Sequence, residues 1–125
     1  MVQIALKIQK SSEDYLETMF VLKEEKGYIR SIDIAERLSV TKPSVSYATK
    51  RLRENGYITM DRDGLIELTG KGAEIAEKIY SRHKILTKFF ISLGVDEKTA
   101  ADDACKIEHD ISDETLGAIR DHAGM

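Results

Sequence analysis

The stretch Ser31–Asn55, SIDIAERLSVTKPSVSYATKRLREN, decides the fold of this chain. Its first part predicts a short helix over 32–38, because Ser31 is a favoured N-cap residue and apolar residues recur on one face. Ser39-Val40 then predicts a tight turn, and Thr41 predicts the N-cap of a second helix that runs to the end of the stretch. Two short helices joined by a tight turn are typical of a helix-turn-helix.

A hairpin is expected after the second helix. Two short runs with strand composition cover 57–60 and 65–68, and Asp61-Arg62-Asp63-Gly64 between them is typical of a hairpin turn. A helix-turn-helix followed by a two-stranded hairpin is the pattern of a winged helix. The segment 41–62 carries five basic and two acidic residues, a net charge of +3, although the whole chain carries −3. This local excess favours a basic working face.

Further helices are expected on both sides of this motif. Apolar spacing predicts a helix from residue 11 or 12 to about 25 and a long helix from about 69 to 94. Asp96 is expected to cap a helix that runs through Asp110, and Ser112 to cap a last one. The expected fold is mainly α, with an N-terminal winged helix-turn-helix followed by an all-helical domain.

Composition limits the class of protein. The chain has 125 residues, of which 42% are hydrophobic and 33% charged, as is ordinary for one soluble domain or two small ones. It has no apolar run of about eighteen residues, so no membrane-spanning helix is expected. Residues 1–7 lack the features of a signal peptide. The single cysteine, Cys105, cannot form an internal disulfide, which favours a cytoplasmic location.

The second helix of the helix-turn-helix is the candidate DNA-reading element, because such a helix places its N-terminal residues against base edges. The residues expected there are Thr41, Lys42, Pro43, Ser44, Ser46 and Tyr47. The residues that suit phosphate contacts are Lys50, Arg51, Arg53 and, in the hairpin, Arg62. Ser44, Ser46 and Thr49 are mediocre helix formers on an expected exposed face, which favours a contact surface. The alternatives are a helix pair that only packs and a winged helix that binds protein.

A second motif, Asp103-Ala104-Cys105-Lys106-Ile107-Glu108-His109, lies in a segment that is expected to be helical. Residues three and four apart share one face of a helix, so Cys105 is expected to lie beside both Glu108 and His109. Sulfur, oxygen and nitrogen donors that converge on one point indicate a transition-metal site.

Three further residues are weaker candidates for metal ligands. Asp14 and Glu17 share a face of the first helix, where such a pair is usually solvated or favoured by the helix dipole. His83 stands among apolar neighbours, where a histidine is more often a satisfied core residue. These three residues become stronger candidates for metal ligands if a helical bundle behind the winged helix brings their segments close to the motif at 103–109.

Several motifs, in order along the chain, resemble the diphtheria toxin repressor family of metal-dependent regulators, which includes the manganese transport regulators. The matching segments are Ser12-Glu13-Asp14-Tyr15-Leu16-Glu17, Asp33-Ile34-Ala35-Glu36-Arg37-Leu38, Pro43-Ser44-Val45-Ser46, Leu68-Thr69-x-x-Gly72, Arg82-His83, and 103–109 with Ser112-Asp113-Glu114. They cover nearly the whole chain.

The resemblance implies a homodimeric repressor of metal-uptake or metal-homeostasis genes that binds a palindromic operator on double-stranded DNA. It implies a DNA-binding winged helix over 1–72 and a helical metal-binding and dimerisation domain over 73–125. Fe(II) or Mn(II) is the implied corepressor. The ligands carried over by position are Asp14, Glu17, His83, Cys105, Glu108 and His109.

This implied ligand set is a hybrid of the family's two types. Asp14 matches the manganese type and replaces a methionine of the iron type, whereas Cys105 matches the iron type and replaces a carboxylate of the manganese type. The ancillary site of the iron type is incomplete, because Thr87 and Ala101 replace its glutamate and histidine. Since a thiolate shifts preference away from manganese, iron is slightly favoured. His83 then either joins the carboxylates of the first helix or serves a weaker second site.

Two other classes of function are alternatives. In a metal-independent winged-helix regulator the cysteine motif would be incidental, and replacing Glu108 or His109 by alanine separates this class from a corepressor-dependent one. An enzyme such as a metal hydrolase is disfavoured, because the chain has no His-Glu-x-x-His motif, no glycine-rich phosphate loop and no nucleophile elbow. We therefore expect no enzymatic activity.

Overall fold

The computed structural model describes residues 10–123 of the chain. The chain divides into two compact units, Met1–Glu77 and Lys78–Met125, and each is described by itself. The division falls inside the long helix α5 (Gly70–Ser92), which also contains the domain boundary expected after residue 72. Residues 1–7, to which the expectation about a signal peptide applies, lie outside the described part. Within residues 10–123, no helix combines the length and apolar character needed to cross a membrane.

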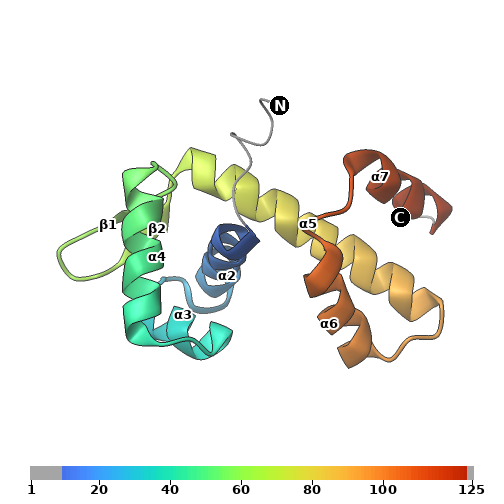
Figure 1. Cartoon of the computed structure of the whole chain (residues 1–125), viewed down its shortest axis with the longest axis horizontal. Helices are drawn as coiled ribbons and strands as arrows, with labels where there is room; N and C mark the ends of the chain where they lie inside the picture. Colours follow the sequence, from blue (N-terminus) through green and yellow to red (C-terminus); the bar gives the residue numbers. More distant parts are fainter. Residues whose placement is uncertain (1–9, 124–125) are drawn as a thin grey trace. The chain divides into compact units, whose positions relative to one another are not determined.

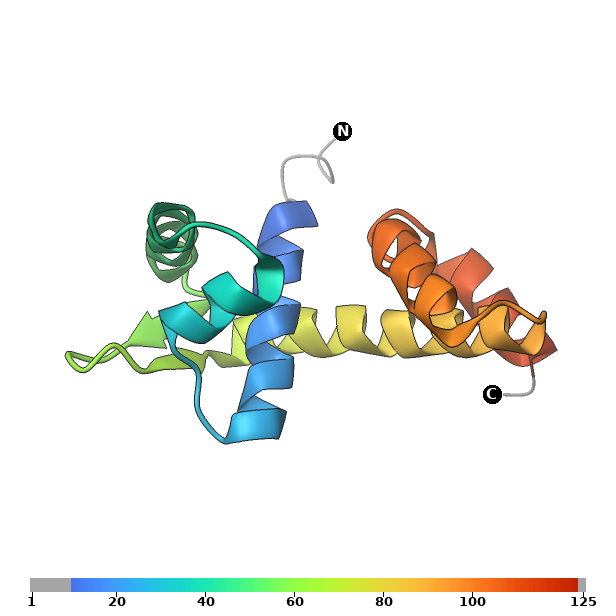
Figure 2. The same ribbon diagram turned by 90° about the horizontal axis from the view of Figure 1, so that it is seen from below.

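The first unit is a helix-turn-helix followed by a hairpin, as the sequence predicts (Figure 1). Its elements are α2 (Lys10–Lys26), α3 (Ser31–Leu38), α4 (Lys42–Glu54), β1 (Ile58–Met60), β2 (Ile66–Leu68) and the start of α5. The strands pair antiparallel, with Ile58 opposite Leu68 and Met60 opposite Ile66. The hairpin projects away from the helices of this unit (Figure 2).

Apolar residues from every element of the first unit meet in one core. The buried members include Leu16, Met19 and Leu22 from α2, Ile34 from α3, Val45 and Leu52 from α4, Ile58 and Ile66 from the strands, and Ala76 from α5. Burying a large apolar side chain stabilises the folded state by about 1.5–3 kcal/mol relative to leaving it exposed. This core therefore holds α4 and the hairpin firmly against α2.

Two local expectations in this unit are wrong. Ser31 does not cap α3, because the helix begins at Ser31 itself and Arg30 occupies the N-cap position without a side-chain cap bond. Thr49 is buried rather than exposed, because it stands one turn after Val45 on the inward face of α4. Its hydroxyl donates to the Ser46 carbonyl, so burial leaves no polar atom of this side chain unsatisfied.

The hairpin is tied to the start of α5 by the Thr69-x-x-Gly72 motif. Thr69 Oγ1 lies 2.7 Å from the Gly56 carbonyl oxygen and 3.0 Å from that of Tyr57, and it accepts a hydrogen bond from the Gly72 amide. A Cβ on Gly72 would lie 2.1 Å from the Tyr57 carbonyl oxygen. Only glycine therefore lets the helix approach the hairpin this closely.

The second unit contains the rest of α5, α6 (Glu97–Ile107) and α7 (Asp113–His122). Leu86, Ala104 and Leu116, one from each helix, form a small core. Figure 2 shows α6 and α7 beside the second half of α5. Asp96 and Ser112 cap α6 and α7 through their side chains, as predicted.

Helix α6 ends earlier than predicted. Its last residue is Ile107 and its C-cap is Glu108, so the expectation that the helix runs through Asp110 is wrong. The Glu108 carbonyl accepts a hydrogen bond from Arg82 of α5 instead of continuing the α6 ladder. Glu108 nevertheless keeps helical backbone angles, so its side chain still follows the helix face that carries Cys105.

Candidate metal centre and DNA-binding surface

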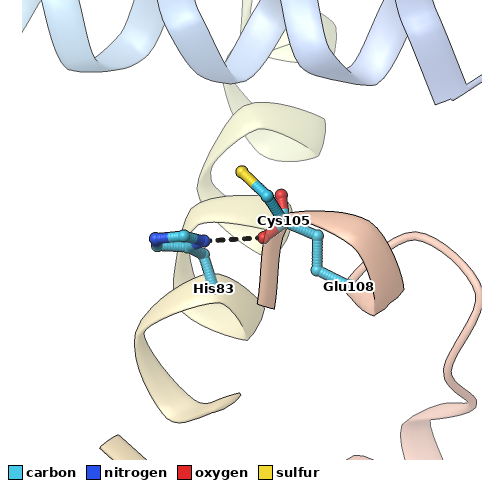
Figure 3. Close-up of side chains that lie close together, drawn as sticks. All are labelled: His83, Cys105 and Glu108. Atoms are coloured by element: carbon cyan, nitrogen blue, oxygen red, sulfur yellow. Dashed lines mark hydrogen bonds and ion pairs between the residues drawn. The ribbon is translucent and has the colours of Figure 1, made fainter. Parts of the chain in front are cut away.

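Three side chains of the second unit lie together, His83 of α5 with Cys105 and Glu108 at the end of α6 (Figure 3). Each offers one ligand atom, and these atoms all lie within 4.8 Å of one another. Packing of α5 against α6 around Leu86 and Ala104 brings them together. We call these three residues the α5–α6 cluster.

His83 is not the apolar-core histidine that its neighbours in sequence suggest. Its side chain is 23% exposed, and its Nδ1 lies 2.8 Å from Glu108 Oε1. Hydrogen bonds to Cys105 and to Glu108 raise the pKa of His83 from 6.5 to about 10, against the opposing effect of burial. The imidazole is therefore charged at neutral pH, and a metal ion that binds this nitrogen must displace a proton.

Glu108 is fully buried. Its Oε1 pairs with His83, whereas its Oε2 has no hydrogen-bond partner among the described residues, and His109 Nε2 is 3.6 Å away. A buried carboxylate oxygen without a donor is costly, and a divalent cation would satisfy it. Together with an imidazole nitrogen and a cysteine sulfur, this carboxylate fits a transition-metal ion such as Fe(II).

The other predicted ligands lie outside the α5–α6 cluster. His109 is buried next to Glu108, but within the described residues no single group contains Cys105, Glu108 and His109, so their expected convergence on one point is not found. Asp14 and Glu17 are half-buried on α2 in the first unit, and their role as ligands stays a prediction.

Arg82 belongs to the surroundings of the cluster, and the sequence reasoning assigned it no role. It is buried on α5, and its guanidinium donates to the carbonyl oxygens of Glu108 at 2.9 Å and Ile111 at 2.6 Å. A third hydrogen bond, of 2.5 Å, goes to the carboxylate of Asp113. The Arg82-His83 pair was part of the family resemblance, but a sequence motif does not reveal which backbone groups an arginine binds.

The predicted DNA-reading residues form one exposed surface of the first unit. Thr41 caps α4 by accepting a hydrogen bond from the Ser44 amide, and Pro43 lies in the first turn, as predicted. The exposed residues of this surface are Thr41, Lys42, Pro43, Ser44, Ser46, Tyr47, Lys50 and Arg51. Tyr47 is 64% exposed, and Arg51 donates to its hydroxyl at 3.1 Å.

The hairpin turn adds a second basic position. Arg62 is exposed there, and the Asp61 carboxylate accepts the amides of Asp63 and Leu65, which fixes the turn. Arg30, which precedes α3, donates to the Asp63 carbonyl at 3.1 Å. No local sequence pattern predicts this contact, because the two residues are far apart along the chain.

Comparison with known proteins matches both halves of the chain. Residues 7–66 match the N-terminal DNA binding domain of iron dependent repressors, and residues 69–125 match their metal binding and dimerisation domain. The chain belongs to the iron-dependent repressor family. The family resemblance drawn from the motifs is thereby confirmed, and so is a mainly helical fold with an N-terminal helix-turn-helix domain.

Three known proteins are similar to this chain over most of its length. An uncharacterized HTH-type transcriptional regulator of Methanocaldococcus jannaschii is 38% identical over 115 residues, which are 90% of this chain and 92% of the relative. The structure of the manganese regulator SloR matches with a TM-score of 0.80 and 28% identity, over 90% of this chain and 53% of that one. The structure of T. acidophilum IdeR has the same fold, with a TM-score of 0.81 and 24% identity, over 95% and 55%. This chain spans about half the length of these two solved structures.

Proposed function

We propose that this chain is a transcriptional repressor of metal-uptake or metal-homeostasis genes, with Fe(II) or Mn(II) as corepressor. The observation that carries the proposal is the buried Glu108 carboxylate, whose Oε2 lacks a hydrogen-bond partner among the described residues, beside His83 and Cys105. Family membership supports it, because the family combines a DNA-binding domain with a domain for metal binding and dimerisation. The working form is a homodimer on a palindromic operator.

The donor set supports iron over manganese. Manganese prefers oxygen-rich octahedral sites, whereas the sulfur of Cys105 shifts preference towards Fe(II) and later metals. The proposed ligands are Asp14, Glu17, His83, Cys105, Glu108 and His109. The first two rest on the family resemblance, and His83, Cys105 and Glu108 are supported by the short distances within the α5–α6 cluster.

The proposed mechanism couples the ligands to the spacing of the DNA-reading helices. Asp14, Glu17 and Glu108 are the proposed carboxylate ligands, and a divalent cation, when bound, would supply the positive charge that offsets their mutual repulsion. Ligands drawn from α2, α5 and α6 would then restrain the two units, and in a dimer the two α4 helices would be spaced near one turn of DNA or a multiple of it. Metal can raise operator affinity only by as much as it prefers the DNA-competent arrangement over others. Such a coupling free energy between two binding events is usually about 1–3 kcal/mol.

On the operator, the surface of α4 divides into two roles. Hydroxyls at the start of the helix, such as those of Ser44 and Ser46, suit base edges in the major groove, and Tyr47 suits a thymine methyl group. Lys50, Arg51 and Arg53, with Arg62 of the hairpin, suit phosphates, which provide affinity without sequence choice.

A gel-shift titration tests corepression, with an operator selected from random duplexes in the presence of anaerobic Fe(II) or Mn(II). We expect tight binding with metal and weak binding with chelator, and equal binding in all conditions would contradict the proposal. Glu108→Gln should abolish the metal dependence, whereas Asp110→Asn, which removes an exposed carboxylate two residues away, should retain it. If Glu108→Gln keeps the metal dependence of the wild type, Glu108 is not a ligand of the corepressor. If the wild type itself binds the operator equally with metal and with chelator, the chain is a metal-independent winged-helix regulator.

A further inference from the structure

Arg82 and His83, neighbours on α5, hold Glu108 from two sides. His83 contacts its carboxylate at 2.8 Å, and Arg82 donates to its backbone carbonyl at 2.9 Å. We propose that Arg82 is a positioning residue, which raises the metal affinity of the α5–α6 cluster by fixing the backbone from which the Glu108 side chain projects. This inference rests on the proposed function, because it concerns affinity for the corepressor metal.

The contacts of Arg82 match the chemistry of a helix end. Its Nη1 bridges the carbonyl oxygens of Glu108 and Ile111, and its Nη2 pairs with Asp113. These carbonyls follow the last turn of α6, where backbone acceptors have no donors within the helix and a nearby cation is favoured by the helix dipole. A planar guanidinium serves three acceptors in fixed directions, which the compact ammonium of a lysine does not.

Glu108 depends on this support because it is the C-cap of α6. The α6 ladder holds only its amide, which donates to the Ala104 carbonyl at 2.9 Å. Without Arg82, the peptide that follows Glu108 would be free to rotate and to carry the carboxylate away from His83 and Cys105. In metal sites, removing a group that orients a ligand typically lowers metal affinity about 10–100-fold.

Anaerobic titration of the full chain with Co(II) tests the inference, because thiolate-to-cobalt absorption reports coordination by Cys105. Arg82→Met should weaken Co(II) affinity about 10–100-fold and reduce this absorption band. The matched variant Lys78→Met removes a surface cation that also pairs with Asp113, at 3.6 Å, and should change affinity by less than about twofold. Wild-type affinity in folded Arg82→Met, or an equal loss in Lys78→Met, would overturn the inference.

Two milder variants keep the inference testable if Arg82→Met does not fold. Arg82→Lys retains the positive charge but lacks the planar guanidinium that serves three acceptors. Its Co(II) affinity should therefore lie between those of Arg82→Met and the wild type. Asp113→Asn keeps Arg82 but weakens the hydrogen bond that holds its guanidinium. It should lower Co(II) affinity by less than Arg82→Met does. Unchanged Co(II) affinity in both variants would overturn the inference.

A last control separates positioning from general packing. Leu116→Ala opens the same small core and should lower the thermal unfolding midpoint of the metal-free protein while Co(II) affinity stays near that of the wild type. If it weakens Co(II) binding as much as Arg82→Lys does, the role of Arg82 is only structural and the inference fails. A wild-type chain that binds no Co(II) would overturn the proposed function itself, and the inference with it.

Discussion

His83 Nδ1 lies 2.8 Å from Glu108 Oε1, and this contact joins α5 to the end of α6 at a fully buried carboxylate. The second proton of this imidazole and a metal ion are alternatives, because a coordinating imidazole must be neutral. In the metal-free protein, the protonated imidazole is the counter-ion of Glu108. The same two side chains therefore serve the apo protein as an ion pair and the proposed metal form as ligands.

We expect this ion pair to stabilise the metal-free protein in a pH-dependent way. Because the pKa of His83 is raised from 6.5 to about 10 in the folded state, its stabilising effect is complete below pH 6.5 and is lost as the pH rises through 10. The free energy of unfolding of the wild type minus that of His83→Gln, measured with chelator present, should therefore shrink between these values. A difference that grows with pH would contradict the contact.

Cys105 is expected to set the preference between metals. Cys105→Asp replaces the sulfur ligand by a carboxylate, so the ratio of Fe(II) to Mn(II) affinity should fall about tenfold or more. Cys105→Ser, which keeps the size of the side chain, should lower the affinity for Fe(II) without raising the affinity for Mn(II). Competition with a chelator under anaerobic conditions measures both affinities, and a ratio unchanged by Cys105→Asp would refute a role for the thiol.

Gly72 is expected to be required where α5 meets the hairpin. Its substitution by alanine places a methyl group against the Tyr57 carbonyl oxygen, so Gly72→Ala should destabilise the chain by about 1–3 kcal/mol. Gly70→Ala is the matched control, because a Cβ at Gly70 meets nothing within 4 Å. Denaturant titration compares the two, and equal stability would show that the hairpin moves away without cost.

The α4 surface should separate into base-reading and phosphate-binding positions. Lys50→Ala should weaken binding to all duplexes alike. It should also reduce the magnitude of the slope of log K against the logarithm of salt concentration by about one. Ser46→Ala should weaken binding to the selected operator and leave binding to unrelated DNA unchanged. Fluorescence anisotropy over a series of salt concentrations measures both effects. The assignment fails if Lys50→Ala changes sequence preference while Ser46→Ala changes only the salt dependence.

The local signals of the sequence predicted most element boundaries. The cap residues Thr41, Asp96 and Ser112 act on amides two or three residues away, so their roles are encoded within one turn. The prediction that Thr49 is exposed is wrong, because low helix propensity does not determine burial, and the position of Thr49 one turn after Val45 places it on the buried face. Position on the helix decided the outcome, and propensity did not.

The candidate site was less accessible to sequence reasoning. The proximity of Cys105 to Glu108 followed from their spacing, but their contact with His83 depends on how α5 packs against α6. Only the family resemblance selected His83. The hydrogen bonds of Arg82 to backbone carbonyls have no sequence signature, and they also explain why α6 ends before Asp110, where local signals placed its end.

X-ray absorption at the iron edge of anaerobic, Fe(II)-loaded protein tests the central claim most directly, namely that the α5–α6 cluster holds the corepressor metal. We predict one sulfur scatterer among nitrogen and oxygen ligands, and its loss in Cys105→Ser. A shell of nitrogen and oxygen alone in the wild-type protein would contradict the account.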